Sequence, residues 1–200
     1  MKQLVIYVHG KGGSEKEADH YRPLFVGSIV IGFDYQSQDP WHAEREFSDF
    51  FDQVAKGYDS VVLVANSIGA FFAMSGLAEK KIAKAFFISP IVSMERLIVD
   101  MMNRSNITEE ELRRKEEIVT DSGETLSWEY LCYVRAHPVK WRIPTCVLYG
   151  ERDNLTFEEA ISDFAEQAGA SLTIMKGGEH WFHTDSQMRF LDDWIRKNVQ

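Results

Sequence analysis

The sequence has little cysteine and no long hydrophobic run. Its two cysteines, Cys132 and Cys146, lie among apolar or aromatic neighbours, which favours two small buried residues and gives a disulfide no support. The apolar segment near the N-terminus ends at Val8, and a membrane-spanning helix needs about 20 apolar residues. No small-residue cleavage site of the kind found in secretory signals follows it. These absences predict a soluble, cytoplasmic protein.

Positive charge is also scarce. The chain carries 22 lysines and arginines against 31 aspartates and glutamates, a formal net charge of -9. Little is available to neutralise phosphates, so we expect neither a nucleic acid nor an anionic membrane as a partner. An apolar content of 44% over 200 residues is typical of a globular protein with a buried core. The length fits one domain, or one domain with an insertion.

Six short apolar runs alternate with longer helix-like segments. Each run is nearly continuous in apolar character, which is typical of strands buried on both faces of a parallel sheet. Helical crossovers between such strands predict an α/β fold, with an open, mainly parallel six-stranded sheet flanked by helices. The predicted strands are Gln3–Val8, Ile29–Phe33, Val61–Ala65, Ala85–Ile88, Thr145–Tyr149 and Ser171–Met175.

Several helix starts can be identified from capping residues. Asp39 followed by Pro40 is typical of an N-cap with proline at the first helical position. Three further pairs match the spacing of a capping box, in which a threonine is followed three residues later by Glu or Gln. These pairs are Thr108 with Glu111, Thr156 with Glu159, and Thr184 with Gln187.

The stretch between Pro90 and Pro144 interrupts the alternation. It contains no strand-like run and is longer than one crossover helix requires. We interpret residues 91–143 as a helical insertion within a single domain of residues 1–200, forming a cap over one end of the sheet. The alternative is a set of helices packed on the flank with no role in a site. The expected helices are Met94–Asn103, Thr108–Val119 and Ser127–His137.

Ser67 lies where a buried strand passes directly into a helix. The residues two before and two after it, Ala65 and Gly69, are small. A tight strand-to-helix turn that exposes a nucleophilic serine requires small residues at both positions, because bulk there would collide. Such a turn also places a helix N-terminus beside developing negative charge. The alternative is that Ser67 only caps the helix.

A glycine-rich loop follows the first strand, with the sequence His9-Gly10-Lys11-Gly12-Gly13-Ser14. Acyl transfer needs two backbone N–H groups aimed at the oxyanion. We expect one from Ile68, the residue after the serine, and the other from the backbone of Lys11. A phosphate-binding turn is the alternative, but the spacing of a Walker motif is missing. We expect His9 to have a structural role.

A general base must meet Ser67 at the same edge of the sheet. His180 follows the last predicted strand and precedes the final helix, so it is the favoured base among six histidines. His183 is the competitor, but it adjoins the helix start, which favours a local role. Two histidines three residues apart can hint at a metal, but no third ligand lies near them in the sequence. We therefore expect neither a metal nor a cofactor.

The acid that orients the base is expected on the loop after the fifth strand. Asp153 is the candidate there, and Glu151 is the fallback. The chain order is then Ser67, Asp153 and His180, the order given for Ser-His-Asp hydrolases built on α/β sheets. A separation of 27 residues between Asp153 and His180 leaves room for one helix and one strand.

With these motifs, the chain resembles the α/β-hydrolase superfamily over essentially its whole length. The loop from His9 to Gly13 resembles the family's oxyanion loop, and Ala65–Gly69 resembles its nucleophile turn. The segments Gly150–Asp153 and Gly178–Phe182 resemble its acid and histidine loops. The resemblance implies a mainly parallel sheet with an insertion as a lid, and we expect this chain to depart from the family by lacking its first two strands. Asn66 stands where histidine is common.

The expected activity is hydrolysis of a small ester or thioester through an acyl-enzyme on a Ser67–His180–Asp153 triad. A small-molecule substrate would then be the partner. Amide hydrolysis, perhydrolysis or C–C cleavage at the same site are alternatives, as is a binding protein without catalysis on this scaffold. Candidate pocket residues, although a stripe of Met and aromatic residues at helical spacing is more often plain core, are Met94, Leu97, Trp128, Tyr130, Tyr133 and Trp141.

Overall fold

The computed structural model describes residues 2–199, which form two compact units. The sheet unit runs up to Val92 and resumes at Lys140, and the inserted unit spans Ser93–Val139. The boundaries of the inserted unit fall inside the expected range of 91–143. Between residues 2 and 199, no helix has the length and apolar character needed to cross a membrane.

The sheet unit contains six parallel strands in the order β2-β1-β3-β4-β7-β8. The predicted open, parallel six-stranded sheet is therefore confirmed. Strands β1 and β3 are neighbours, although the chain passes through β2 between them, so their carboxyl ends flank a switch point in strand order. The strands are β1 Gln3–Val8, β2 Ile29–Phe33, β3 Ser60–Asn66, β4 Lys84–Ile88, β7 Thr145–Gly150 and β8 Ser171–Met175.

The expectation that every strand is buried on both faces is wrong for the two edges of the sheet. Ile29 of β2 is 54% exposed and Ile174 of β8 is 40% exposed. An edge strand has a neighbouring strand on one side only, so the covering helices leave part of it open to solvent. The apolar character of these two strands did not distinguish them from the central ones.

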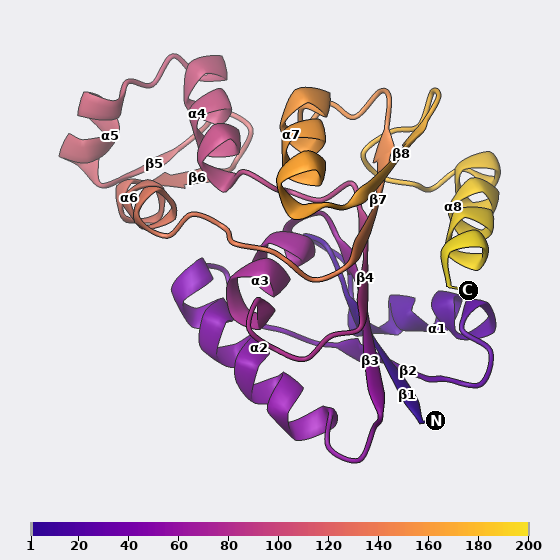
Figure 1. The fold of residues 1–200 in the computed structure, drawn as a ribbon. Helices are drawn as coiled ribbons and strands as arrows, with labels where there is room; N and C mark the ends of the chain where they lie inside the picture. The colour runs from indigo at the N-terminus through magenta and orange to yellow at the C-terminus, as the bar shows by residue number, and fades with distance from the viewer. Residues whose placement is uncertain (1, 200) are drawn as a thin grey trace. The chain divides into compact units, whose positions relative to one another are not determined.

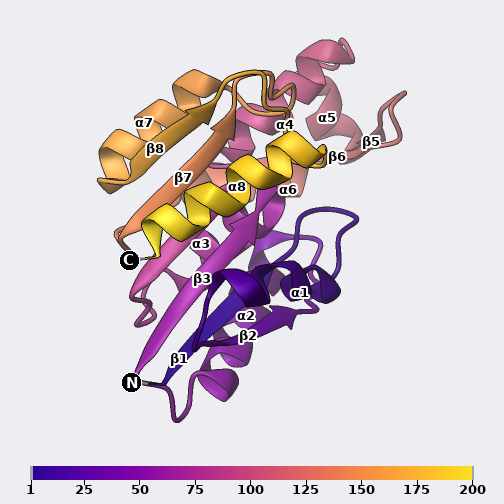
Figure 2. The ribbon, with the colours of Figure 1, turned by 90° about the vertical axis from the view of Figure 1, so that its right-hand side faces the viewer.

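Helices cover both faces of the sheet (Figure 1). On one face lie α1 (Ala18–Tyr21) and α8 (Asp185–Asn198), which Figure 2 shows in front of the strands. On the other face lie α2 (Pro40–Val54), α3 (Ser67–Leu77) and α7 (Glu158–Ala168). Two short 3₁₀ turns, Glu15–Glu17 and Arg22–Leu24, flank α1. The core beneath α1 and α8 includes Tyr7, Val64, Phe86, Leu148 and Trp194.

Two of the predicted helix caps in the sheet unit are present, and one is not. Asp39 accepts a hydrogen bond from the N–H of His42, and Thr184 accepts one from the N–H of Gln187. The capping box predicted at Thr156 is wrong, because α7 begins at Glu158. The N–H of Thr156 instead donates to the Asp153 carboxylate, which keeps Thr156 in the preceding loop.

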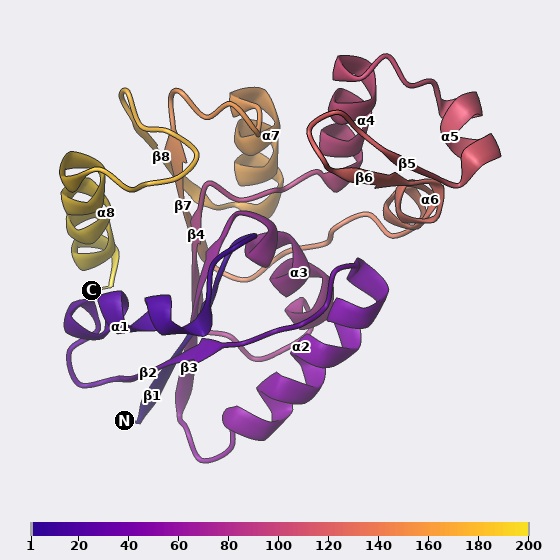
Figure 3. The same ribbon diagram turned by 180° about the vertical axis from the view of Figure 1, so that it is seen from behind.

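The inserted unit consists of three helices and a small hairpin (Figure 3). The predicted helix over Thr108–Val119 is wrong in its last part, because the helix ends at Lys115 and Glu117–Val119 forms a strand. Glu116 adopts a left-handed φ of 65°, which ends the helix, and the strand pairs antiparallel with β6. The elements are α4 Met94–Arg104, α5 Glu109–Lys115, β5 Glu117–Val119, β6 Thr125–Ser127 and α6 Trp128–Ala136.

The two cysteines are both free, but they differ in burial. Cys146 of β7 is buried as expected, whereas Cys132 of α6 is exposed, so the expectation of burial is wrong for Cys132. Helix α6 buries Leu131 and Val134, and Cys132 lies outside that buried stripe. Aromatic neighbours in the sequence do not reveal which face of a helix a residue occupies.

Arg135 of α6 links all three helices of the inserted unit. Its Nε donates to Glu95 of α4 at 2.7 Å, and its Nη1 donates to Glu109 of α5 at 2.9 Å. The second guanidinium nitrogen, Nη2, also donates to Glu109, which makes that pair bidentate. Bidentate arginine–carboxylate pairs stabilise a protein more than single surface ion pairs do.

We predict that Arg135→Met lowers the free energy of local unfolding of the inserted unit by about 1 kcal/mol at low salt. Hydrogen exchange of the α6 amides measures this quantity. The difference should shrink at about 1 M salt, where charges are screened. Arg113→Met on α5 is the matched control. Equal effects of the two substitutions, or an effect of Arg135→Met that salt does not reduce, would contradict the prediction.

Candidate active site

Ser67 is the first residue of α3 and follows β3 without a connecting loop. Its φ of 49° lies in the left-handed region, which is strained for a residue with a side chain. Strain of this kind persists only where the surrounding packing imposes it. The turn lies at the carboxyl end of β3, at the switch point in strand order.

The packing around this turn leaves no room for a side chain at Gly69 and little room for one at Gly10. A Cβ atom on Gly69 would lie 2.3 Å from the carbonyl oxygen of His9 and 2.9 Å from Val8 Cγ1. A Cβ atom on Gly10 would lie 3.2 Å from the Cβ of Ser67. The start of α3 therefore presses against the end of β1 so closely that larger residues would displace one of them.

The structure brings Ser67, His180 and Asp153 together as a chain of hydrogen bonds. Ser67 Oγ lies 2.9 Å from His180 Nε2, and His180 Nδ1 lies 2.7 Å from Asp153 Oδ2. The Asp153 side chain is fully buried, and the His180 side chain is 17% exposed. The three residues follow β3, β7 and β8, so the carboxyl edge of one sheet supports all of them.

The environment of Asp153 favours its ionised form. Burial alone would raise the pKa of this carboxyl, but the hydrogen bond to His180 and the positive charge of the protonated imidazole lower it. The backbone N–H groups of Leu155 and Thr156 add to this, because both donate to Asp153 Oδ1 at 2.9 Å. The net result is a pKa below the ordinary value. A buried carboxylate with these partners can orient an imidazole and stabilise its charged form.

The loops that carry the acid and the histidine lie against each other through their backbones. The N–H of Arg152 donates to the carbonyl of Gly178 at 2.7 Å. A Cβ atom on Gly150 would lie 2.6 Å from the carbonyl oxygens of Gly178 and Glu179. Close approach at this glycine sets the spacing between Asp153 and the histidine loop.

Glu151, the fallback acid, and His183, the competing base, have other partners. Glu151 accepts a hydrogen bond from the N–H of Gly177 at 2.8 Å, so its carboxylate holds the histidine loop from outside. The His183 ring stacks on Trp181, and its Nδ1 lies 2.7 Å from the Trp181 carbonyl oxygen. His183 thus makes local contacts at the start of α8, and His180 is the histidine that is hydrogen-bonded to Ser67 Oγ.

The glycine-rich loop begins at the carboxyl end of β1, beside the start of α3. Gly13 donates its N–H to the carbonyl of Gly10 at 3.1 Å, and Gly12 has a φ of 75°. His9 Nδ1 lies 2.8 Å from the Gly10 carbonyl oxygen, and the His9 ring stacks on Tyr35. These contacts form a tight turn around Lys11. The roles of the Lys11 and Ile68 amides toward an oxyanion stay a prediction.

The predicted pocket residues fall in both units. Met94 and Leu97 are buried in α4, and Trp141 belongs to the sheet unit. Trp141 is 4% exposed, and its indole N–H donates to Thr145 Oγ1 at 2.7 Å. Their contribution to a substrate pocket stays a prediction, as does that of the α6 residues Trp128, Tyr130 and Tyr133.

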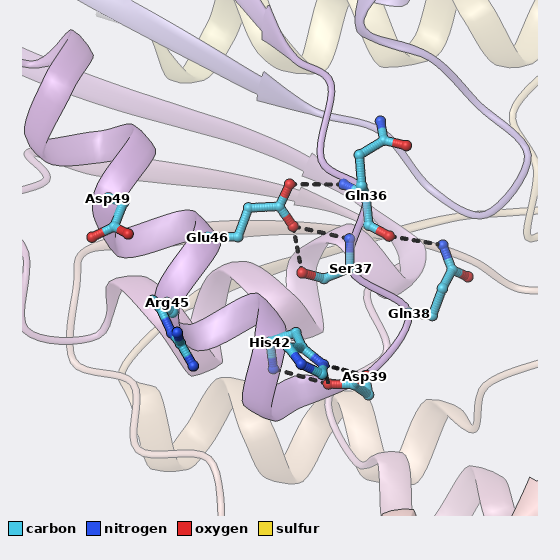
Figure 4. A pocket seen from close by; sticks show the side chains of 8 residues that line it. All are labelled: Gln36, Ser37, Gln38, Asp39, His42, Arg45, Glu46 and Asp49. Carbon is cyan, nitrogen blue, oxygen red and sulfur yellow. Dashed lines mark hydrogen bonds and ion pairs between the residues drawn. The ribbon is translucent and has the colours of Figure 1, made fainter.

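A pocket lined by polar and charged residues, which the sequence analysis did not single out, opens beside the loop between β2 and α2 (Figure 4). The Glu46 carboxylate there accepts hydrogen bonds from the N–H groups of Gln36 and Ser37, at 2.8 and 2.9 Å. These bonds fix the loop to α2. The pocket is lined by Gln36, Ser37, Gln38, Asp39, His42, Arg45, Glu46 and Asp49. Over residues 2–199, no three His, Cys, Asp or Glu side chains gather as metal ligands would.

Comparison with solved structures identifies the fold. Est1E from Butyrivibrio proteoclasticus superimposes with a TM-score of 0.80 at 16% identity, over 99% of this chain and 87% of that one. Alpha/beta hydrolase domain-containing protein 10 from mouse gives a TM-score of 0.76 at 16% identity, over 98% and 89% of the two chains. This chain has the α/β-hydrolase fold. The expected resemblance is therefore confirmed at the level of the fold.

The match found by sequence comparison covers a smaller part of this chain than the structural matches do. A Mycoplasma genitalium protein described as "Putative esterase/lipase 3" is 29% identical over 103 residues, which are 45% of this chain and 37% of that protein. The aligned segment thus spans little more than a third of the relative's length. No protein-family profile matches the chain.

The lowered pKa of Asp153 predicts a pH-dependent contribution to stability. A carboxyl whose pKa is lower in the folded state stabilises the fold above its ordinary pKa, and this contribution is lost as the pH falls through the folded pKa. We expect the difference in unfolding free energy between the wild type and Asp153→Asn to shrink from about pH 5 to about pH 2. Denaturant titrations at each pH measure it.

Asp121→Asn is the control, because Asp121 lies exposed in the turn between β5 and β6. The same charge is removed there without a buried partner. A difference between wild type and Asp153→Asn that stays constant over this pH range would contradict the prediction.

Proposed function

We propose that this chain is a serine hydrolase that cleaves a small ester or thioester through an acyl-enzyme on Ser67. The observation that carries the proposal is the hydrogen-bonded series from Ser67 to His180 to Asp153. The strained turn at Ser67 adds to it, because a residue that only caps a helix does not need a left-handed conformation. The esterase/lipase description of the Mycoplasma genitalium relative agrees with this class of reaction.

In the proposed reaction, Ser67 Oγ attacks the substrate carbonyl carbon while His180 Nε2 takes the proton of the serine hydroxyl. The carbonyl oxygen becomes an oxyanion, which the backbone N–H groups of Ile68 and Lys11 would stabilise. His180 then gives its proton to the leaving alcohol or thiol, and the acyl group stays on Ser67. A water molecule, deprotonated by His180, then attacks the acyl carbon, the bond to Ser67 Oγ breaks, and His180 returns the proton to Ser67 as the acid leaves.

Asp153 acts on this reaction through His180. Its carboxylate accepts a hydrogen bond from Nδ1–H, so the unprotonated Nε2 faces Ser67. The same negative charge stabilises the imidazolium that forms when His180 is protonated. The lowered pKa of Asp153 keeps it ionised at neutral pH.

We predict that a fluorophosphonate probe labels Ser67 and no other residue of the folded protein. The probe reports an activated serine, because an ordinary hydroxyl is a weak nucleophile. Mass spectrometry of the labelled peptide identifies the site. Ser75→Ala on the same helix should label like the wild type, whereas Ser67→Ala should stay unlabelled. Label that persists in Ser67→Ala, or a folded wild type that takes no label, would overturn the nucleophile assignment.

We also predict turnover of p-nitrophenyl esters, with the rate depending on acyl-chain length. His180→Ala should lower kcat by roughly 10³-fold or more, since it removes the base that activates the nucleophile. His183→Ala should stay within a few-fold of the wild type. Absence of turnover across the whole ester panel would contradict ester hydrolysis. A higher rate on the matching p-nitroanilides would favour amide hydrolysis instead.

A further inference from the structure

A second chain of hydrogen bonds joins the two backbone segments that flank the proposed oxyanion position. The hydroxyl of Tyr7 donates to Glu17 Oε2, and Asn66 Nδ2 donates to the Tyr7 oxygen at 2.8 Å. The N–H of Ser14 donates to Glu17 Oε1 at 3.2 Å. These contacts connect residues of the first loop, of β1 and of the end of β3.

The ends of this chain lie close in sequence to the two predicted oxyanion donors. Asn66 immediately precedes Ser67 and lies two residues before Ile68. Ser14 closes the glycine-rich loop three residues after Lys11. The Glu17 carboxylate therefore contacts one segment directly and reaches the other through one buried tyrosine.

Tyr7 is suited to transmit this contact. Its side chain is fully buried and its ring stacks on Tyr21 at 4.8 Å between ring centres. Burial, with the nearby charge of Glu17, raises the pKa of Tyr7 well above its usual value. The hydroxyl therefore stays neutral, donating one hydrogen bond to Glu17 and accepting one from Asn66.

The loop backbone also rests against the Glu17 carboxylate. A Cβ atom on Gly13 would lie 2.6 Å from Glu17 Oε1. The Ser14 side chain and the Glu17 carboxylate form a reciprocal capping box at the start of the Glu15–Glu17 turn. Two kinds of contact, packing and hydrogen bonding, thus fix the position of the loop relative to Glu17.

We propose that Glu17 is a positioning residue for the oxyanion hole. It holds the Lys11 loop through Ser14, and it holds the start of α3 through Tyr7 and Asn66. This inference rests on the proposed function, because it assigns the hole to the Lys11 and Ile68 amides. A misplacement of such donors by about 1 Å can lower a rate by about 10²-fold.

Glu17→Gln tests the inference with little change in size. The carboxylate accepts from two donors, whereas an amide has only one acceptor oxygen, so one of the two hydrogen bonds is lost. Tyr7→Phe interrupts the same chain at its middle. Glu15→Gln, two residues away in the same short helix, is the matched control and should behave like the wild type.

The kinetic measurement compares an oxoester with its thionoester, in which sulfur replaces the carbonyl oxygen. Sulfur is a weak hydrogen-bond acceptor, so the thionoester gains less from oxyanion donors. We expect Glu17→Gln to lower kcat for the oxoester by about 10-fold with KM unchanged within twofold. The thionoester rate should fall clearly less. Partial unfolding or a weakened nucleophile would lower both rates equally.

Hydrogen exchange gives a measurement that does not need activity. The Ser14 amide donates directly to Glu17, so it should exchange faster in Glu17→Met, which has the same length but no acceptor oxygen, while amides of β8 keep their wild-type rates. Unchanged exchange at Ser14, or an unchanged ratio of oxoester to thionoester rates in an active enzyme, would overturn the positioning role and leave the proposed function intact. A wild type inactive on both substrates would instead overturn the proposed function. Hydrogen exchange would still test the contact between Ser14 and Glu17 in that case.

Discussion

The close contact between the start of α3 and the end of β1 is the constraint on which the site depends. Gly69 lies so near the His9 carbonyl that a Cβ there would approach within 2.3 Å. This contact accompanies the left-handed conformation of Ser67, which turns the chain from β3 into α3 without a loop. It also brings the glycine-rich loop beside the serine. The proposed nucleophile and the proposed oxyanion donors therefore depend on one backbone contact.

Close backbone approach at a glycine also occurs on the other side of the site. Gly150 permits the histidine loop to pass close to the end of β7, and Arg152 and Glu151 hydrogen-bond to that loop. His180 and Asp153 then meet across two loops rather than within one element. Because these loops approach each other through their backbones, glycine is required at a few positions where a larger residue would collide.

Patterns of residues predicted the strands because burial in a parallel sheet demands continuous apolar runs. All six were found, and the order of the site residues along the chain agreed with their meeting at one edge. The failures are local. The helix expected to reach Val119 ends at Lys115 because the following residues pair with β6. Thr156 does not cap α7 because its N–H binds Asp153. In both cases a contact with another segment overrode a local preference.

By itself, the sequence determined the order of the six sheet strands along the chain, the turn at Ser67 and the small set of acids and histidines that could act with it. Only the tertiary structure decided which of two acids close in sequence contacts His180. Asp153 rather than Glu151 meets His180, although the two acids lie two residues apart. Tertiary structure also joined Tyr7 to Asn66 across 59 residues and placed Glu17 against Tyr7. The reason is physical: hydrogen bonds need atoms within about 3 Å, and residue type and spacing do not specify such distances across a fold.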